Sequence, residues 1–415
     1  MSTSPDFVDP LDLVDPERYA RRGYPHDVWT RLRREAPVAS FAPDGFEPFW
    51  AITKHADVVE ISKQPLRFSS EPGITLRLAG APIYASEMVV MLDPPRHGPM
   101  RRVINGRFTP RAVRERRDDV DRIAVDVMDA AAPADSTGEL DFVERIAAPL
   151  PLGVIAWVLG VPREDWDLIF RWTNEIIGKE DPEYRRAGET PDQTARRARR
   201  EVHAYFRRLI EQRRAEPTDD LVSELIRGEV DGKPLTEEQL VAYTELLVEA
   251  GNETTRNAIS GGLLALAEHP AEWEKLRTNP ELLPDAVEEI LRWASPISHF
   301  TRTATEDYEL RGEKIRAGEQ VALYYASANR DEDVFDDPFT FRVERRPNPH
   351  LAFGFGEHFC MGAHVARVEI ETIFRHLTRR LEAFEVCGEV ERLSSITNGS
   401  IKHLPLRVRM AEGDA

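Results

Sequence analysis

The stretch FGFGEHFCMG (residues 353–362) is the most informative part of this sequence, because it surrounds one of only two cysteines with glycine and aromatic residues. Gly354, Gly356 and Gly362 lack a Cβ atom, so backbone N–H groups can approach the sulfur of Cys360 closely. N–H groups aimed at a sulfur favour the thiolate over the thiol. The positive end of a helix predicted from Ala363 to Ile370 favours the same anion. The stretch therefore predicts a thiolate that ligates a metal.

This stretch and the residues after it resemble the haem-ligand loop of the cytochrome P450 monooxygenases, whose pattern is F-G-x-G-x-H-x-C-x-G. The one departure is Val365, where the family usually carries Leu. The resemblance implies that Cys360 is the axial ligand to the iron of haem b, and that Phe353, Gly354 and Gly362 contact the haem. A thiolate ligand pushes electron density onto the iron and favours O–O cleavage. The alternative interpretation is a buried cysteine in a glycine-rich turn.

The length of 415 residues suggests two or three domains, but no linker, repeat or low-complexity segment divides the chain. The content of 41% hydrophobic and 31% charged residues is ordinary for a globular protein. The resemblance implies a mainly α fold with small β-sheets (α+β), the cytochrome P450 fold, as a single triangular helical body. We therefore expect a single domain over residues 1–415.

The formal net charge of −18 argues against nucleic acid and anionic membranes as partners. Residues 1–19 lack the basic and apolar regions of a signal peptide, and no apolar run has the length of a membrane span. We expect a cytoplasmic monomer. Cys360 and Cys387 could form a disulfide, but we expect both to be reduced, with Cys387 buried as a small hydrophobic residue.

A second motif, LDPPRHGPMR (residues 92–101), holds two donor side chains four positions apart. On a helix, His97 and Arg101 share one face, which suits a carboxylate partner. The resemblance implies that this partner is a haem propionate, and that Arg302, His350 and His358 are further propionate contacts. The alternatives are a solvated basic face for the first pair and a surface histidine for His358.

The residues that follow are unusually basic for so acidic a chain. The arginines of this region are Arg101, Arg102, Arg107, Arg111, Arg114, Arg116 and Arg117. The resemblance places Arg101, Arg102 and Arg107, with Cys360, on the side of the haem where electron donors dock. A positive patch there would attract an acidic ferredoxin. The alternative is an ordinary solvated face.

The longest periodic segment predicts a helix over Thr236–Glu268, with a capping box formed by Thr236 and Gln239. Gly251 lies in its middle, where a glycine costs about 1 kcal/mol relative to alanine. A glycine at such a position indicates that another group comes close to the helix backbone.

Residues 250–254 of this helix read AGNET and resemble the family pattern A-G-x-[DE]-T. The resemblance implies that the helix passes over the haem, that Ala250 contacts it, and that Gly251 makes room for O₂. Oxygen activation consumes protons, so we predict that Thr254 donates a hydrogen bond at the oxygen and that Glu253 supplies protons through water. The alternatives are a helix-interior threonine and a surface acid.

A later helix, Asp285–Trp293, carries the pattern E-x-x-R. The resemblance implies that Glu289 and Arg292 form a buried ion pair that also includes Arg345, although Arg346 is an alternative third member. Breaking a buried pair costs about 3–5 kcal/mol, so we expect these residues to maintain the fold and retain haem.

The remaining expectations concern the pocket and its cover. By resemblance, the polar connection Gly178–Thr194 and its flanking helices form a mobile lid. We also predict strands over Glu309–Lys314 and Gln320–Tyr324 around a turn at residues 317–318. The residues expected to face substrate are Val248, Ile297, His299, Phe300 and Ile401.

Taken together, the resemblance implies a haem-thiolate monooxygenase that inserts one atom of O₂ into a C–H bond of an apolar small molecule. The candidates are a steroid side chain, a branched lipid, a terpenoid or an alkyl-aromatic compound. A ferredoxin and its reductase would supply electrons, since the two cysteines cannot hold an iron–sulfur cluster. The alternative is a non-catalytic haem-thiolate protein that binds or senses a ligand.

Overall fold

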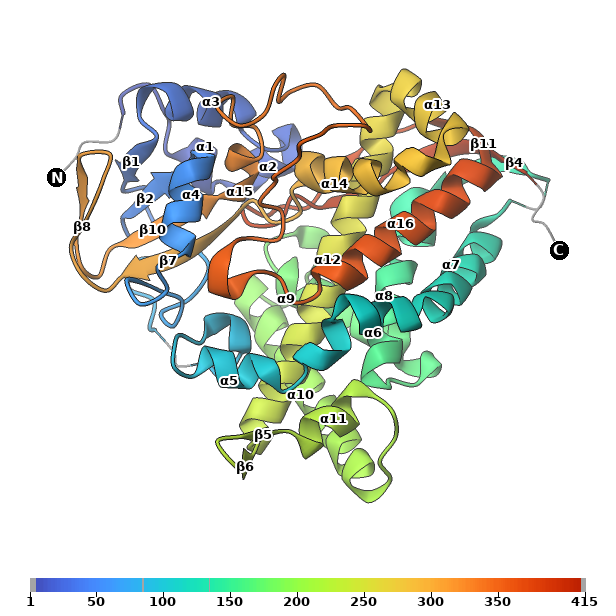
Figure 1. Ribbon diagram of the computed structural model, residues 1–415, viewed down its shortest axis with the longest axis horizontal. Coiled ribbons are helices and arrows are strands. Elements are labelled where there is room, and N and C mark those ends of the chain that lie inside the picture. The colour runs from blue at the N-terminus through green and yellow to red at the C-terminus, as the bar shows by residue number, and fades with distance from the viewer. Residues whose placement is uncertain (1–4, 84–85, 134, 412–415) are drawn as a thin grey trace.

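The protein consists mainly of α-helices, with one larger β-sheet to one side (Figure 1). The computed structural model describes residues 5–83, 86–133 and 135–411. The helices are α1 (Leu11–Val14), α2 (Pro16–Arg22), α3 (His26–Glu35), α4 (His55–Ser62), α5 (His97–Arg102), α6 (Pro110–Glu115), α7 (Arg117–Ala131), α8 (Pro149–Leu159), α9 (Trp166–Ile177), α10 (Pro191–Ala215), α11 (Leu221–Arg227), α12 (Glu237–Glu268), α13 (Pro270–Thr278), α14 (Leu283–Ala294), α15 (Tyr325–Ala328) and α16 (Ala363–Arg380). The strands are β1 (Val38–Phe41), β2 (Phe49–Ile52), β3 (Phe68–Ser69), β4 (Thr137–Asp141), β5 (Glu229–Val230), β6 (Lys233–Pro234), β7 (His299–Ala304), β8 (Tyr308–Leu310), β9 (Glu313–Ile315), β10 (Gln320–Tyr324), β11 (Leu381–Val386), β12 (Glu391–Arg392), β13 (Ile401–His403) and β14 (Pro405–Met410).

The largest sheet has five strands in the order β1-β2-β10-β7-β3. β10 runs parallel to β2 and antiparallel to β7, with Leu323 opposite Phe300 and Tyr324 opposite His299. A smaller antiparallel sheet joins β11, β14 and β4. Because side chains alternate along a strand, the register of β7 decides which of its residues face one side of the sheet and which face the other.

α12 is the central element of the helical part and crosses the middle of the molecule (Figure 1). The predicted capping box is present: Gln239 N donates to Thr236 Oγ1 at 3.3 Å, and Thr236 N donates to Gln239 Oε1 at 3.0 Å. The N-terminal half of α12 packs in one hydrophobic cluster with α8 to α11, and its C-terminal half packs in another with α7, α14 and α16. One helix therefore joins the two largest cores, which holds its middle in a defined place.

The fold confirms the predicted class, because helices dominate, the sheets are small and the outline in Figure 1 narrows from the upper edge to α10 and α11.

One predicted strand is wrong. The segment Glu309–Lys314 is a hairpin of β8 and β9, because Arg311 and Gly312 have φ of 53° and 84° and turn the chain. Cys387 is free as predicted but only half-buried, because it follows β11 near the surface of a small sheet.

Candidate functional site

The cysteine loop lies between β10 and α16 and is shaped by its glycines. Gly354 and Gly356 have φ of 69° and 74°, a region that strains residues with a Cβ atom. A Cβ on Gly356 would also collide with the Ser62 carbonyl oxygen. Cys360 N donates to Phe353 O at 2.9 Å and closes the loop. The local sequence therefore folds into a rigid turn that ends one residue before α16.

The Gly362 N–H bonds to the sulfur of Cys360, as predicted. The pKa of the thiol, however, is raised and not lowered. Cys360 is exposed as a residue, but neighbouring protein atoms surround its sulfur. This burial raises the pKa of the thiol. The Gly362 N–H and the charges of Arg101 and Arg367 lower the same pKa without offsetting the burial. The protein thus directs positive groups at the sulfur, but the net effect of these surroundings leaves the pKa of the thiol above its ordinary value.

Four of the predicted propionate ligands come together beside this loop. The rings of His97 and His358 lie 4.2 Å apart, and Arg101 donates to the Phe359 carbonyl at 2.6 Å. Burial, followed by the charges of Arg302, His97 and Arg101, lowers the pKa of His358 to about 3. Within the described ranges, Arg101 and Arg302 form no ion pair and bond only to backbone carbonyls. A cluster of donors without enough carboxylates suits a ligand that carries carboxylate groups.

His350 does not join this cluster, and we correct that prediction. Its Nε2 atom lies 3.1 Å from Glu288 Oε2, and its Nδ1 atom accepts a hydrogen bond from Ala352 N at 3.2 Å. Arg367 donates to the same Glu288 carboxylate. Because both ring nitrogens are engaged, His350 serves to join α14, α16 and the cysteine loop instead.

The residues predicted to lie beside the haem and bound O₂, Ala250, Gly251 and Thr254, are in the middle of α12. Thr254 is half-buried, and its Oγ1 atom donates to Ala250 O at 2.9 Å, one turn earlier. Ala250 is exposed although it lies in a helix that is otherwise largely buried. A Cβ on Gly251 would lie 2.8 Å from Ile155 Cγ1, so the close approach inferred from this glycine is the packing of α8 against α12. The role of Gly251 toward O₂ stays a prediction.

Glu253 is buried in a polar network rather than exposed at the surface. It pairs with Arg256 on the next turn, and Ser400 Oγ donates to its Oε1 atom at 2.6 Å. Asn257 Nδ2 donates to Ser400 Oγ at 2.7 Å, and Arg256 donates to Asn174 of α9 at 3.0 Å. The second oxygen of Glu253 has no protein partner. The three-residue spacing of Glu253 and Arg256 on a helix indicates this pair, whereas no local pattern in the sequence indicates Ser400.

The predicted scaffold pair is present, and its third member is Arg345. Arg292 Nε lies 2.7 Å from Glu289 Oε2, and Arg345 Nε lies 3.0 Å from the same atom. All three side chains are almost completely buried. Arg346 instead pairs with Asp285 at the surface. Burial raises the pKa of Glu289, but the bonds from the two arginines outweigh it and lower the pKa overall.

The predicted substrate-facing residues divide into two groups. Phe300 is half-buried and lies on the same face of β7 as Arg302, so it remains a candidate. His299 lies on the opposite face, is completely buried, and contacts the Tyr324 ring at 4.9 Å; that prediction is wrong because strand alternation turns the side chain into the core. Val248 and Ile401 are also buried in the hydrophobic clusters.

Ile297 is half-buried and forms an isolated bridge with Asn398 of the C-terminal hairpin. It therefore lies where the hairpin approaches the start of β7 and remains a candidate for substrate contact.

Only some arginines of the basic segment lack an acidic partner within the described chain. Arg107 pairs with Asp219 and Glu224, so it fixes α11 and is not available for docking. Arg111 and Arg117 also have acidic partners. Within the described chain, Arg102 and Arg114 are exposed and form no ion pair. Arg114 lies close enough to lower the pKa of His364, four positions after the cysteine.

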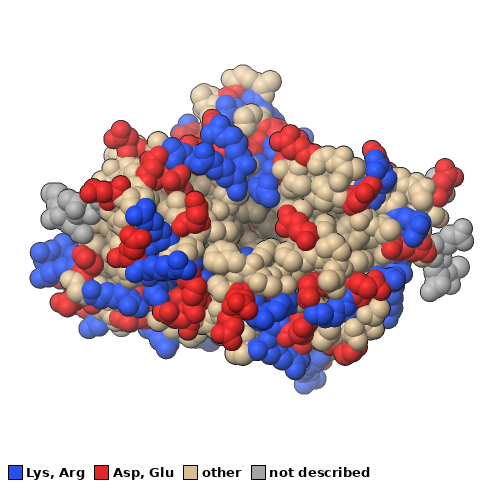
Figure 2. Space-filling view, turned by 90° about the horizontal axis from the view of Figure 1, so that it is seen from above, with Lys and Arg blue, Asp and Glu red and all other residues tan. Residues whose placement is uncertain are grey.

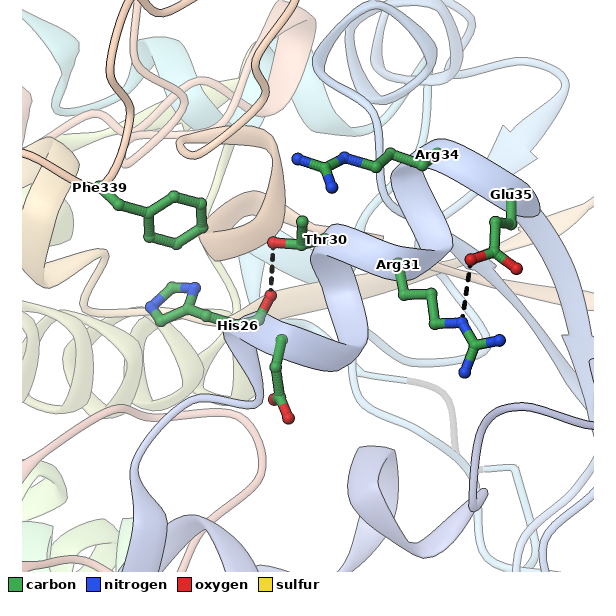
Figure 3. Close-up of a pocket in the computed structure, with 7 residues that line it drawn as sticks. His26, Thr30, Arg31, Arg34, Glu35 and Phe339 are labelled. Atoms are coloured by element: carbon green, nitrogen blue, oxygen red, sulfur yellow. Dashed lines mark hydrogen bonds and ion pairs between the residues drawn. The ribbon is translucent and has the colours of Figure 1, made fainter.

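A separate pocket lies along α3 and does not belong to this site (Figure 3). Its Arg31 Nε lies 2.9 Å from Glu35 Oε1, and Thr30 Oγ1 donates to His26 O at 2.7 Å. Its lining residues do not come from the cysteine loop, α5 or α12. We therefore assign the functional site to the region around Cys360.

Comparison with known proteins agrees with this assignment. The family model for Cytochrome P450 matches residues 18–407. The chain belongs to the cytochrome P450 family. This P450 is 41% identical to a steroid C26-monooxygenase of Mycobacterium tuberculosis over 96% of its own chain and 93% of the relative. It is 42% identical to a methyl-branched lipid omega-hydroxylase of the same species, over 91% and 90% of the two chains.

A solved structure supports the fold of this P450. The Mycobacterium marinum cytochrome P450 CYP268A2, determined in complex with pseudoionone, superposes with a TM-score of 0.89 at 33% identity and covers 97% of this chain and 100% of its own. Among the described residues, no helix combines the length and apolar character required to cross a membrane.

The residues of this P450 fit haem b, the cofactor of the family. Cys360 is an exposed residue, and within the described chain Arg101 and Arg302 form no ion pair and His358 has only Ser70 Oγ as a hydrogen-bond partner, whereas His97 lies 3.1 Å from the Glu357 carboxylate. The protein is therefore a haem-dependent monooxygenase, as its named relatives are monooxygenases or hydroxylases. The alternative of a non-catalytic sensor has no support from these relatives.

Proposed function

We propose that this P450 hydroxylates a C–H bond of a steroid side chain or a methyl-branched lipid. The observation that carries this proposal is the near full-length identity of 41–42% with two enzymes named for these substrates. Pocket residues vary on a common scaffold, so terpenoid and alkyl-aromatic compounds belong in the same test.

The residues around the site suit this reaction. When bound, haem supplies the oxygen activation, with Cys360 as ligand and the four clustered donors holding the propionates. Thr254 presents a hydroxyl that can rotate from Ala250 O to a ligand above it. Glu253 has one free carboxylate oxygen and lies one position away, so it can pass protons to the site through water.

We propose that electrons arrive from an acidic ferredoxin at the side of the molecule that holds Arg102 and Arg114. These two arginines are exposed and unpaired within the described chain, and Arg114 affects a residue close to the cysteine loop. Charges of this kind accelerate encounter with a partner of opposite sign.

The first experiment is an optical titration of the haem-loaded protein. Apolar compounds that displace water from ferric haem shift its spin state, so a panel of sterols, branched fatty acids, terpenoids and alkyl-aromatics will rank the substrate class. We expect a steroid that carries C26 in its side chain, or a methyl-branched fatty acid, to give the largest shift. Turnover of the best ligand, followed by mass analysis of the product, then locates the hydroxyl group.

A shift confined to small terpenoids or alkyl-aromatics would contradict the lipid proposal while leaving the monooxygenase assignment unchanged. The Phe300→Ala variant tests the candidate substrate contact. It should change the ranking of ligands without changing the spectrum of the reduced carbon monoxide complex.

A further inference from the structure

A second pocket, of about 260 Å³, lies away from the cysteine loop. Its walls come from α2, the C-terminal half of α12, the end of α14 and the hairpin of β12 and β13. It shares His26 and Phe339 with the pocket shown in Figure 3, so the two pockets are neighbours. No step of the proposed reaction uses this pocket.

The charge of this pocket is opposite to that of the protein. Arg22, Arg330 and Arg392 line it, together with one carboxylate, that of Glu268, although the whole chain carries a net charge of −18. Within the described chain, neither Arg22 nor Arg392 forms an ion pair or a side-chain hydrogen bond. Burial lowers the pKa of His26 well below its usual range, so His26 adds no charge. The pocket therefore has a formal excess of positive charge.

Arg330 places one of these charges at the buried side of the pocket. Its side chain is only 2% exposed, and it lies 4.3 Å from the centre of the Trp293 ring. Two of its nitrogens donate to the carbonyls of Arg292 and Trp293, each at 2.9 Å, at the C-terminal end of α14. These carbonyls offset part of the charge. The Nε–H group, however, has no acceptor, and no carboxylate pairs with Arg330 among the described residues.

The volume and the lining residues of the pocket indicate the size and the apolar character of its ligand. Tyr19, Tyr24, Trp293 and Phe339 supply aromatic surface, and Leu264 with Leu393 supplies aliphatic surface. A volume of 260 Å³ equals the share of about nine waters in the liquid, which suits a molecule of about ten non-hydrogen atoms.

We propose that this pocket is a binding site for a small aromatic carboxylate, whose carboxylate pairs with Arg22 and Arg392 and whose ring packs against Trp293 and Tyr24. Guanidinium groups recognise carboxylates with charge-assisted hydrogen bonds, and Arg22 and Arg392 attract the anion at the exposed side.

The inference does not rest on the proposed substrate of the P450. The pocket is separate from the cysteine loop but shares Ser400 with the network of Glu253, because Ser400 lines the pocket and donates to that carboxylate. A ligand in the pocket would therefore contact a residue that donates a hydrogen bond to Glu253.

The test is calorimetric titration of the haem-loaded protein with benzoate and with benzamide, its neutral counterpart of the same shape. We expect saturable binding of benzoate and at least about tenfold weaker binding of benzamide, because a charged acceptor strengthens the hydrogen bond. The same titration with imidazole bound to the haem should give an unchanged affinity for benzoate. Loss of benzoate binding under imidazole would place benzoate at the haem and overturn the proposal.

Matched variants locate the binding site. The double variant Arg22→Gln/Arg392→Gln should weaken benzoate binding at least about tenfold, whereas Arg21→Gln, which removes the neighbouring exposed arginine of α2, should not change it. Equal affinities for benzoate and benzamide, equal losses in both variants, or no saturable binding would each overturn the proposal. These variants leave the buried Arg330 in place, so none of them depends on whether a substitution there folds.

Discussion

At the scale of single residues, Cys360 shows how opposing effects act on one proton. The glycine-rich loop directs a backbone N–H at the sulfur, and Arg101 and Arg367 add positive charge, yet burial raises the pKa of the thiol overall. A thiolate in these surroundings would therefore depend on coordination to iron, the role predicted for Cys360, since coordination of a metal removes the thiol proton.

The Cys360→His variant should lose the strongly red-shifted Soret band of the reduced carbon monoxide complex, and its monooxygenase activity should fall to background. The physical reason is that imidazole donates less electron density to the iron than a thiolate does. The control is Cys387→Ser, which alters a half-buried free thiol and should leave the spectrum unchanged. Full activity of Cys360→His would refute the assignment of the ligand.

The Thr254→Ala variant should bind substrate normally but form product less efficiently. Removing the hydroxyl takes away a proton donor, so we expect at least about tenfold less product per electron consumed, with hydrogen peroxide released instead. Thr254→Ser keeps the hydroxyl and should restore most of the coupling. Oxygen electrode and peroxide assays measure both quantities; an unchanged ratio in Thr254→Ala would show that this hydroxyl is not needed.

At the scale of elements, buried charges join helices to one another and to the loops. Glu289 on α14 collects bonds from Arg292 and Arg345, and Asn348 Nδ2 donates to it at 3.2 Å. Glu369 on α16 is equally buried but has no cationic partner among the described residues, and Thr255 of α12 is its hydrogen-bond partner. These two carboxylates should respond to mutation in different ways.

The Arg345→Gln variant should lower the free energy of unfolding by about 3–5 kcal/mol, because it leaves Glu289 without part of its compensation inside the core. The adjacent Arg346→Gln variant removes an exposed pair with Asp285 and should cost less than about 1 kcal/mol. Urea-induced unfolding followed by haem absorbance and circular dichroism measures both. Equal effects of the two substitutions would contradict the assignment of Arg345 to the buried pair.

The Glu369→Gln variant should be more stable than the parent by an amount that grows with pH. Burial raises the pKa of Glu369 from 4.5 to about 8, so the folded protein holds a proton that the unfolded chain releases in this interval. The stability of the parent therefore falls as pH rises from 4.5 to 8, by up to about 1.4 kcal/mol per pH unit, and glutamine removes this dependence.

The measurement is urea-induced unfolding at pH 5, 6, 7 and 8. The control is Glu371→Gln on the same helix, which removes a partly exposed pair with Arg117 and should cost less than about 1 kcal/mol. A difference between parent and Glu369→Gln that stays constant with pH would show that Glu369 is ionised in the folded protein.

At the scale of the whole molecule, acidic residues outnumber basic ones, with 73 Asp and Glu against 55 Lys and Arg. Figure 2 shows basic and acidic side chains interspersed over one face, despite the net charge of −18. The C-terminal hairpin is tied to the connection between α9 and α10 by such charges: Lys402 Nζ lies 3.1 Å from Asp181 and 2.8 Å from Glu183. These bonds join the expected lid to the hairpin whose Ser400 contacts Glu253.

The Arg102→Glu and Arg114→Glu variants should raise the KM for a reducing ferredoxin about tenfold at low salt, and the difference should narrow at high salt because ions screen exposed charges. The spectrum and the affinity for substrate should not change. Arg21→Glu on α2 is the control. Steady-state reduction at several ionic strengths measures the effect, and an equal rise in KM for Arg21→Glu would indicate net charge alone.

Features that depend on neighbouring residues follow from short patterns in the chain. The cysteine loop, the AGNET turn of α12 and the E-x-x-R pair are local patterns, because fixed spacing on a turn or a helix is sufficient to place such side chains. The capping box at Thr236 was predictable for the same reason.

Features that depend on distant segments follow from the packing of the folded chain. The register of β7 against β10 turned His299 into the core, and Glu288 of α14 engaged His350. Ser400 reached Glu253 across 147 positions of sequence. Strand register and contacts between distant segments are set by the packing of the whole core, so no short pattern in the chain encodes them.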